Sequence, residues 1–276
     1  MSERARIDCQ RHLFDIPEDV AYLNCAYMSP LLRSAAEAGA AAARAKQHPW
    51  EITPGDFFAL PDRGRGAFAR LIGASAEDIA VIPSVSYGVT LAARNVPLGR
   101  DQEVLVLGEQ FPSNVYPWRA VAAERGARLR TVRPPGAEGW TPRLLDAIGP
   151  RTAVVAVPHC HWTDGSLIDL LAVRARTREV GAALVLDVAQ SCGAWPLDVA
   201  TVEPDFLVAV TYKWLLGPYS LGFVYVAPQH QGGQPLEHNW IGRAGAEDFA
   251  RLSWTIRTLP LPGRAPSTWA SGRSSS

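Results

Sequence analysis

Short apolar runs alternate with amphipathic stretches through most of the chain. Seven runs predict β-strands, at residues 79–83, 103–107, 129–132, 153–158, 183–188, 206–211 and 222–226. Several are almost continuously apolar, such as residues 153–157, which read Ala-Val-Val-Ala-Val. A strand that is apolar on both faces is typical of a parallel sheet covered by helices on both sides.

Helical patterns lie between and before these strands. They predict helices at residues 32–46, 62–72, 86–94, 115–125, 143–148 and 169–180. The alanine-rich first helix is expected to end by Pro49, and the last to end at Gly181. The alternation of strands and helices predicts a doubly wound α/β domain, and no internal repeat is visible.

The composition changes near both ends of the chain. We expect an N-terminal segment with its helix over residues 1–45, a large α/β domain over 46–258 and a tail over 259–276. Proline, glycine and serine dominate the tail, and its apolar residues have no periodicity. Such a segment buries too little apolar surface to order itself, so we expect disorder there.

Charge and cysteine content exclude several classes of protein. The 27 basic side chains match the 27 acidic ones, so no excess positive charge indicates a nucleic-acid groove or a membrane surface. No signal-like apolar stretch occurs at the N-terminus, and no uncharged apolar run approaches the ~20 residues that cross a bilayer. The four cysteines form no C-x-x-C pair, so neither zinc nor disulfides are expected. These features are typical of a cytoplasmic, soluble enzyme.

An acidic residue lies at the C-terminal end of one predicted strand, and a lysine lies in the turn after the next. Asp187 lies in Leu-Val-Leu-Asp-Val-Ala-Gln, and Lys213 lies in Val-Thr-Tyr-Lys-Trp. A carboxylate at the end of a buried strand is unfavourable unless its charge is used, and this edge is where open α/β sheets bind ligands. An amine and a carboxylate there suit pyridoxal phosphate, which needs an imine partner and a protonated pyridine nitrogen. Taken singly, Asp187 is better interpreted as a helix cap and Lys213 as a surface lysine. The pair, in this order, favours the cofactor site.

The two segments resemble the cofactor signature of class V aminotransferases, which include cysteine desulfurases, kynureninases and isopenicillin N epimerase-like proteins. The resemblance runs from about residue 22 to 244 and begins with Tyr-Leu-Asn-Cys-Ala-Tyr-Met-Ser-Pro at 22–30, similar to a segment that lines the substrate pocket. It implies the large domain of a fold-type I transferase, with a mostly parallel seven-stranded sheet. It also implies pyridoxal 5'-phosphate held by Lys213 as a Schiff base, an amino-acid substrate and a homodimer.

The resemblance implies roles for residues at several other loops. Ser86 and Tyr87 open a predicted helix, whose free N–H groups would bind the cofactor phosphate. That segment alone favours ordinary capping by Ser84 or Ser86 instead. Residues 110–114, Gln-Phe-Pro-Ser-Asn, are similar to the kynureninase segment Phe-Pro-Ser-Asp. Phe111 would stack on the pyridine ring and Asn114 would replace the aspartate, although an aromatic residue after a strand is usually part of the core.

Three further residues match the family's order. Gln190 would lie near the cofactor's phenolic oxygen, and Tyr212 would contact the phosphate. Trp240, within Asn-Trp-Ile-Gly, would belong to a segment that reaches the phosphate of the neighbouring subunit.

Residues 159–165 read His-Cys-His-Trp-Thr-Asp-Gly and invite two interpretations. A metal site is disfavoured, because His159 and His161 share one face with Cys160 opposite, and no further ligand cluster is visible. The resemblance implies that His161 lies beside the phenolic oxygen, while His159 suits a structural histidine at a strand end.

The chain departs from the family at its C-terminal end. We expect the small C-terminal domain to be missing, together with the arginine that binds the substrate carboxylate and the persulfide cysteine of desulfurases. Cys192 is not expected to replace that cysteine, because it lies in the cofactor segment. Two hypotheses follow: an enzyme catalysing transamination, lyase or epimerase chemistry, or a non-catalytic remnant that binds cofactor weakly or acts only as an interaction partner. A nucleotide-binding domain is disfavoured, because no G-x-G-x-x-G follows a strand.

Overall fold

The computed structural model describes residues 7–134, 136, 138–242, 245–246 and 248–249 of the 276-residue chain. The tail predicted at 259–276 lies outside the described residues. No helix within the described ranges is long and apolar enough to cross a bilayer.

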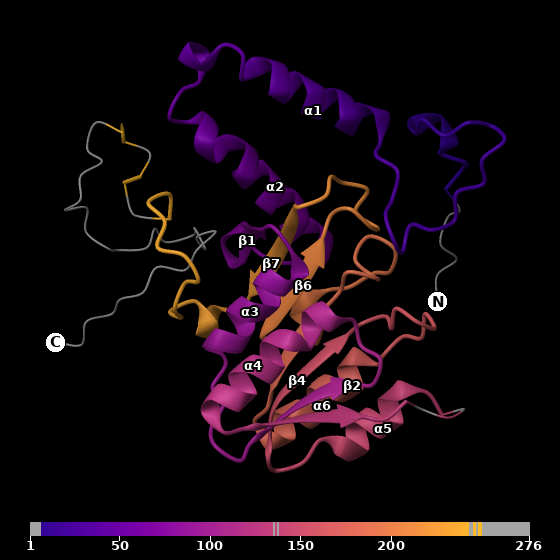
Figure 1. Cartoon of the computed structure of the whole chain (residues 1–276), viewed down its shortest axis with the longest axis vertical. Helices are drawn as coiled ribbons and strands as arrows, with labels where there is room; N and C mark the ends of the chain where they lie inside the picture. Colours follow the sequence, from indigo (N-terminus) through magenta and orange to yellow (C-terminus); the bar gives the residue numbers. More distant parts are fainter. Residues whose placement is uncertain (1–6, 135, 137, 243–244, 247, 250–276) are drawn as a thin grey trace.

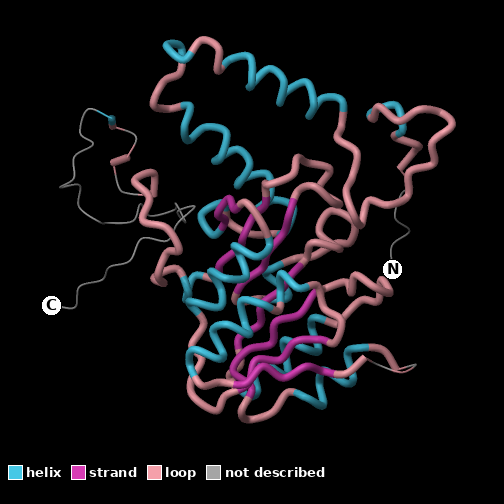
Figure 2. The backbone as a smooth tube through the Cα atoms, viewed as in Figure 1, coloured by secondary structure: helices cyan, strands magenta, loops and turns pink. Residues whose placement is uncertain are grey.

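A seven-stranded sheet forms the centre of the fold (Figures 1 and 2). Its strands, with ends within one residue of those predicted, are β1 (Ile79–Ile82), β2 (Glu103–Leu107), β3 (Arg128–Val132), β4 (Thr152–Pro158), β5 (Ala183–Asp187), β6 (Phe206–Val210) and β7 (Gly222–Val226). The order is β1-β7-β6-β5-β4-β2-β3. Strand β7 runs antiparallel to both of its neighbours, β1 and β6, and all the other pairings are parallel, which confirms the mostly parallel sheet.

Helices cover both faces of the sheet (Figure 1). They are α1 (Arg33–Ala45), α2 (Asp56–Ile72), α3 (Val85–Asn95), α4 (Tyr116–Arg125), α5 (Trp140–Ala147), α6 (Leu170–Val180) and α7 (Val199–Val202). Side chains of α3 and α4 pack into one apolar core, and those of α2, α5, α6 and α7 pack into the other. The near-continuous apolar strands are explained by these two cores, which confirms the α/β fold.

Three helices differ from the prediction. Helix α2 begins at Asp56 rather than residue 62, because the Asp56 carboxylate accepts hydrogen bonds from the backbone and hydroxyl of Thr53. Pro61 therefore lies within the helix and removes one backbone donor. Helix α5 begins at Trp140 rather than residue 143. Helix α7 was not predicted, since four residues are too few to display a helical period.

Helix α1 lies apart from the two cores. None of its residues is buried, and Figure 1 shows α1 and the N-terminal segment extending away from the sheet. The division of the chain at residues 45 and 258 stays a prediction.

A buried carboxylate ties together the amino ends of β5 and β6. Asp205 accepts hydrogen bonds from Leu184 N at 2.8 Å, Arg174 Nη1 at 3.1 Å, His230 Nε2 at 2.8 Å and Gln229 Nε2 at 3.2 Å. Burial by itself opposes ionisation of Asp205, but the bonds from His230 and Leu184 and the charge of Arg174 bring its pKa below the usual value.

We expect Asp205→Asn to destabilise the fold by about 2 kcal/mol at pH 7, the size of hydrogen bonds to a charged group. Because the pKa of Asp205 is lower in the folded state, this stabilisation exists above the unfolded pKa and is lost as the pH falls through the folded pKa. Urea unfolding of both proteins between pH 7 and pH 3 measures the difference. A difference in unfolding free energy that stays constant or widens on acidification would contradict a stabilising role for the Asp205 carboxylate.

Candidate active site

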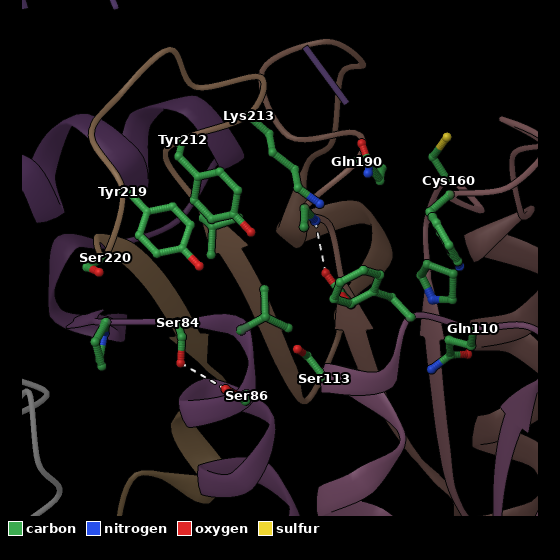
Figure 3. Close-up of a pocket in the computed structure, with 18 residues that line it drawn as sticks. Ser84, Ser86, Gln110, Ser113, Cys160, Gln190, Tyr212, Lys213, Tyr219 and Ser220 are labelled. Carbon is green, nitrogen blue, oxygen red and sulfur yellow. Dashed lines mark hydrogen bonds between the residues drawn. The ribbon is translucent and has the colours of Figure 1, made fainter. Parts of the chain in front are cut away.

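A cavity of about 370 Å³ opens at the carboxyl edge of the parallel strands. The loops after five strands each contribute to its lining, including Ser84 after β1, Phe111 after β2, Cys160 after β4, Gln190 after β5 and Lys213 after β6 (Figure 3). Residues distant in sequence meet here because parallel strands all end at this edge, where open α/β sheets bind ligands.

A closed loop fixes the point at which Lys213 leaves the sheet. The Thr211 hydroxyl donates to the carbonyls of Pro218, at 2.6 Å, and Leu221, at 3.0 Å. Gly217 N donates to Thr211 O at 2.9 Å. A Cβ at Gly217 would lie 2.6 Å from the Thr211 Cβ, so only glycine permits this closure.

The Lys213 side chain points into the cavity and is 7% exposed. Its Nζ lies 5.3 Å from the centre of the Phe111 ring and 5.7 Å from that of Tyr212. Burial lowers the pKa of Lys213, and the Asp187 carboxylate opposes this shift only in part. This shift raises the fraction of uncharged amine, which is the nucleophilic form.

Asp187 is the last residue of β5 and lines the same cavity. Its Oδ1 accepts a hydrogen bond from Ala189 N at 3.0 Å, and no donor in the described part of the chain reaches Oδ2. Burial raises the pKa of Asp187, against the Ala189 bond and the Lys213 charge. A buried carboxylate with one free oxygen suits a cationic ligand atom. The structure thus brings both residues of the predicted pair into one cavity.

The start of α3 contributes hydroxyl groups to the cavity. Ser84 caps the helix by accepting from Tyr87 N at 3.2 Å, and its hydroxyl lies 3.0 Å from that of Ser86 (Figure 3). Ser84 and Ser86 both line the cavity, whereas Tyr87 does not. Burial, with a smaller contribution from Glu237, raises the pKa of Tyr87 to about 12. Ser84 therefore caps the helix, and Ser86 supplies a second hydroxyl to the lining of the cavity.

Phe111 lines the cavity, but Asn114 does not. The Phe111 ring stands nearly perpendicular to Trp162, with centroids 5.5 Å apart. Asn114 is fully buried, and its Oδ1 accepts from Trp118 Nε1 at 3.4 Å. A flat apolar ring is thus available to a ligand, while the amide predicted beside it belongs to the core.

His161 lies away from the cavity, in contrast to the position that the resemblance implies. Its fully buried ring stacks on Trp140, with centroids 4.7 Å apart, and its Nε2 lies 3.1 Å from Gly108 O. Cys160 and Trp162 line the cavity instead. Alternate residues of this extended segment face opposite sides, and the histidines take the inner side.

No group of three or more His, Cys, Asp or Glu residues among those described is placed to hold a metal ion. His159 is buried, and burial lowers its pKa.

Of the three remaining predicted residues, two line the cavity. Gln190 and Tyr212 do so, and the Tyr212 ring packs against Tyr219 with centroids 4.6 Å apart. Trp240 lies elsewhere, edge-on to Phe58 of α2 at 6.3 Å. Whether the segment of Trp240 reaches a neighbouring subunit stays a prediction.

Sequence reasoning missed several lining residues, namely Ser113, Cys160, Trp162, Tyr219 and Ser220. Alternation after β4 could have identified Cys160 and Trp162 by assigning them the face opposite the histidines. Tyr219 and Ser220 carry no such signal. Their position depends on the loop that closes on Thr211, and Ser220 adopts a φ of 61° there.

Comparison with known proteins agrees with this geometry. The sequence profile described as Aminotransferase class-V matches residues 55–243. The chain belongs to the class V aminotransferase family. This family consists of pyridoxal-phosphate enzymes. The matched range of this chain includes the loops after β1, β2, β4, β5 and β6, which line the cavity.

Curated relatives have varied names. An uncharacterized aminotransferase, YcbU, of Bacillus subtilis is 30% identical over 70% of this chain and 52% of its own length. A kynureninase of Burkholderia mallei is 32% identical over 85% of this chain and 58% of its own. An isopenicillin N epimerase of Streptomyces clavuligerus is 29% identical over 80% of this chain and 57% of its own length. The chain therefore spans between 52% and 58% of the length of these relatives.

Solved structures share the fold. A C-DES mutant with glycine covalently linked to its PLP cofactor superposes with a TM-score of 0.78 at 22% identity, over 96% of this chain and 68% of that one. The cysteine desulfurase CsdA from Escherichia coli superposes with a TM-score of 0.69 at 21% identity, over 80% of this chain and 58% of that one. This likeness establishes the fold-type I architecture of the large domain.

Proposed function

We propose that this chain binds pyridoxal phosphate in the cavity at the carboxyl edge of the sheet, covalently through Lys213, and acts on an amino acid. The observation that carries the proposal is the meeting of Lys213 and Asp187 in one buried cavity. Family membership supports the choice of cofactor.

The lining residues fit the parts of this cofactor. The Lys213 amine suits its aldehyde, and the free oxygen of Asp187 suits the pyridine nitrogen. Phe111 offers a flat face for the ring. Ser86 and the N-terminus of α3, an 11-residue helix, suit the phosphate. Tyr212 and Tyr219 add two aromatic hydroxyl groups to the lining.

Each residue contributes in a way that follows from its surroundings. When bound, the cofactor supplies a ring that withdraws electrons from the amino-acid α carbon. Asp187 would hold the ring nitrogen, and a positive charge there would favour the ionised form of its buried carboxylate. Lys213, whose pKa is lowered by burial, would supply the amine that holds the cofactor aldehyde, and the same amine would move a proton at the substrate α carbon as general base.

Reaction type depends on how the substrate is held. We propose transamination, lyase or epimerase chemistry, each of which begins with exchange of the Lys213 linkage for the substrate amine. We also propose a homodimer in the cytoplasm. Turnover of an amino acid by this chain distinguishes an enzyme from a non-catalytic remnant that binds cofactor only.

An absorbance spectrum of the purified chain with added pyridoxal phosphate tests the proposal. We expect a visible band that borohydride bleaches, with the reduced cofactor attached to the protein. Absence of any such band contradicts covalent binding. The chain would then be better described as a non-catalytic remnant that binds cofactor weakly or acts only as an interaction partner.

A further inference from the structure

The Gln190 side-chain amide is held at both ends. Its Oε1 accepts from Trp214 Nε1 at 3.0 Å, and its Nε2 donates to Ala26 O at 3.0 Å. Gln190 also lines the cavity, whereas Trp214, the residue after Lys213, does not. Figure 3 draws Gln190 among the lining residues together with Lys213.

The two partners allow only one orientation of this amide. An indole nitrogen can only donate, and a backbone carbonyl can only accept. Turning the amide over would set two donors against each other at Trp214 and two acceptors against each other at Ala26. The Gln190 nitrogen has two hydrogens, of which Ala26 takes one. The other makes Gln190 a hydrogen-bond donor at the cavity.

Neighbouring contacts keep both partners in place. Ser29 N donates to Tyr212 O at 2.8 Å, which ties the segment containing Ala26 to the strand end before Lys213. On the other side, a Cβ at Gly193 would lie 2.4 Å from Trp214 O. Gly193, at φ 95°, thus lets the backbone of Trp214 pack directly on the loop after β5.

We propose that Trp214 is a positioning residue that fixes the Gln190 amide as a donor to the cofactor's phenolic oxygen. The inference rests on the proposed function, because it requires pyridoxal phosphate linked to Lys213. A donor that stabilises negative charge on this oxygen weakens its hold on the proton of the neighbouring Lys213 linkage. Trp214 thereby lowers the pH at which that proton leaves.

The first test is a pH titration of the visible spectrum of the cofactor-loaded protein. In Trp214→Phe the ring remains but the indole donor is lost, so Gln190 is free to turn over. We expect the titration midpoint to rise by about one pH unit, the scale of one hydrogen bond to a charged oxygen. Gln190→Leu, which removes the donor itself, is expected to raise the midpoint at least as far.

Trp195→Phe is the matched control. It makes the same chemical change at an exposed indole that does not line the cavity, so its midpoint should equal that of the wild type. A midpoint that is unchanged or lower in Trp214→Phe, or one that rises equally in Trp195→Phe, overturns the inference while the Lys213 linkage stands.

A second measurement examines the protein without cofactor. The indole N–H resonance that disappears in Trp214→Phe belongs to Trp214, and it should move in Gln190→Leu if Trp214 donates to Gln190 in solution. A resonance that keeps its position overturns the inference regardless of cofactor. If the wild type forms no borohydride-reducible linkage, the proposed function fails, and the inference fails with it.

Discussion

Lys213→Ala is expected to abolish the borohydride-stable attachment of pyridoxal phosphate while leaving the domain folded. The side chain ends in the cavity, and the loop that carries it is closed by Thr211 and Gly217 rather than by Lys213 itself. We also expect turnover to fall by about 10²–10⁴-fold, the usual contribution of a positioned general base. Mass spectrometry of the reduced protein measures the attachment, and circular dichroism reports the fold.

The chain offers a clean control for this experiment. Its only other lysine is Lys46, which is exposed at the end of α1. Lys46→Ala should keep full attachment and an unchanged visible band. A reduced cofactor found on Lys46 in Lys213→Ala, with the same spectrum as the wild type, would show that the cavity lysine has no special role.

Asp187→Asn is expected to keep cofactor binding but to slow chemistry at the α carbon by about 10²–10³-fold, the effect of removing one preorganised charged partner. An amide has nearly the same shape as the carboxylate, and its oxygen can still accept from Ala189 N. It cannot hold the pyridine nitrogen protonated, so the ring withdraws fewer electrons. Exchange of the α proton of an amino acid with deuterated water, followed by NMR, measures this step.

Asp205→Asn serves as the control, because Asp205 is also a buried carboxylate but does not line the cavity. At neutral pH and low temperature, where this variant stays folded, its exchange rate should match that of the wild type. Equal rates in wild type and Asp187→Asn would exclude Asp187 as the partner of the ring nitrogen.

The sequence by itself determined the sheet and the pair of residues at its centre. The apolar runs predicted all seven strands, because a strand covered on both faces can contain almost no polar residue. Asp187 and Lys213 were identifiable because Asp187 is a charged residue at the end of one such run and Lys213 follows the next run closely. Their meeting follows from the topology, since β5 and β6 are parallel neighbours and end at the same edge.

Only the tertiary structure decided which neighbours face the cavity. His161 and Cys160 are adjacent in sequence, yet Trp140 of α5 stacks on the histidine and leaves the cysteine at the cavity. Asn114 is likewise drawn into the core by Trp118. These outcomes depend on contacts between distant segments, which no local pattern encodes. The Trp214–Gln190–Ala26 arrangement is of the same kind, because its three members lie on separate segments and are joined only when the sheet edge assembles.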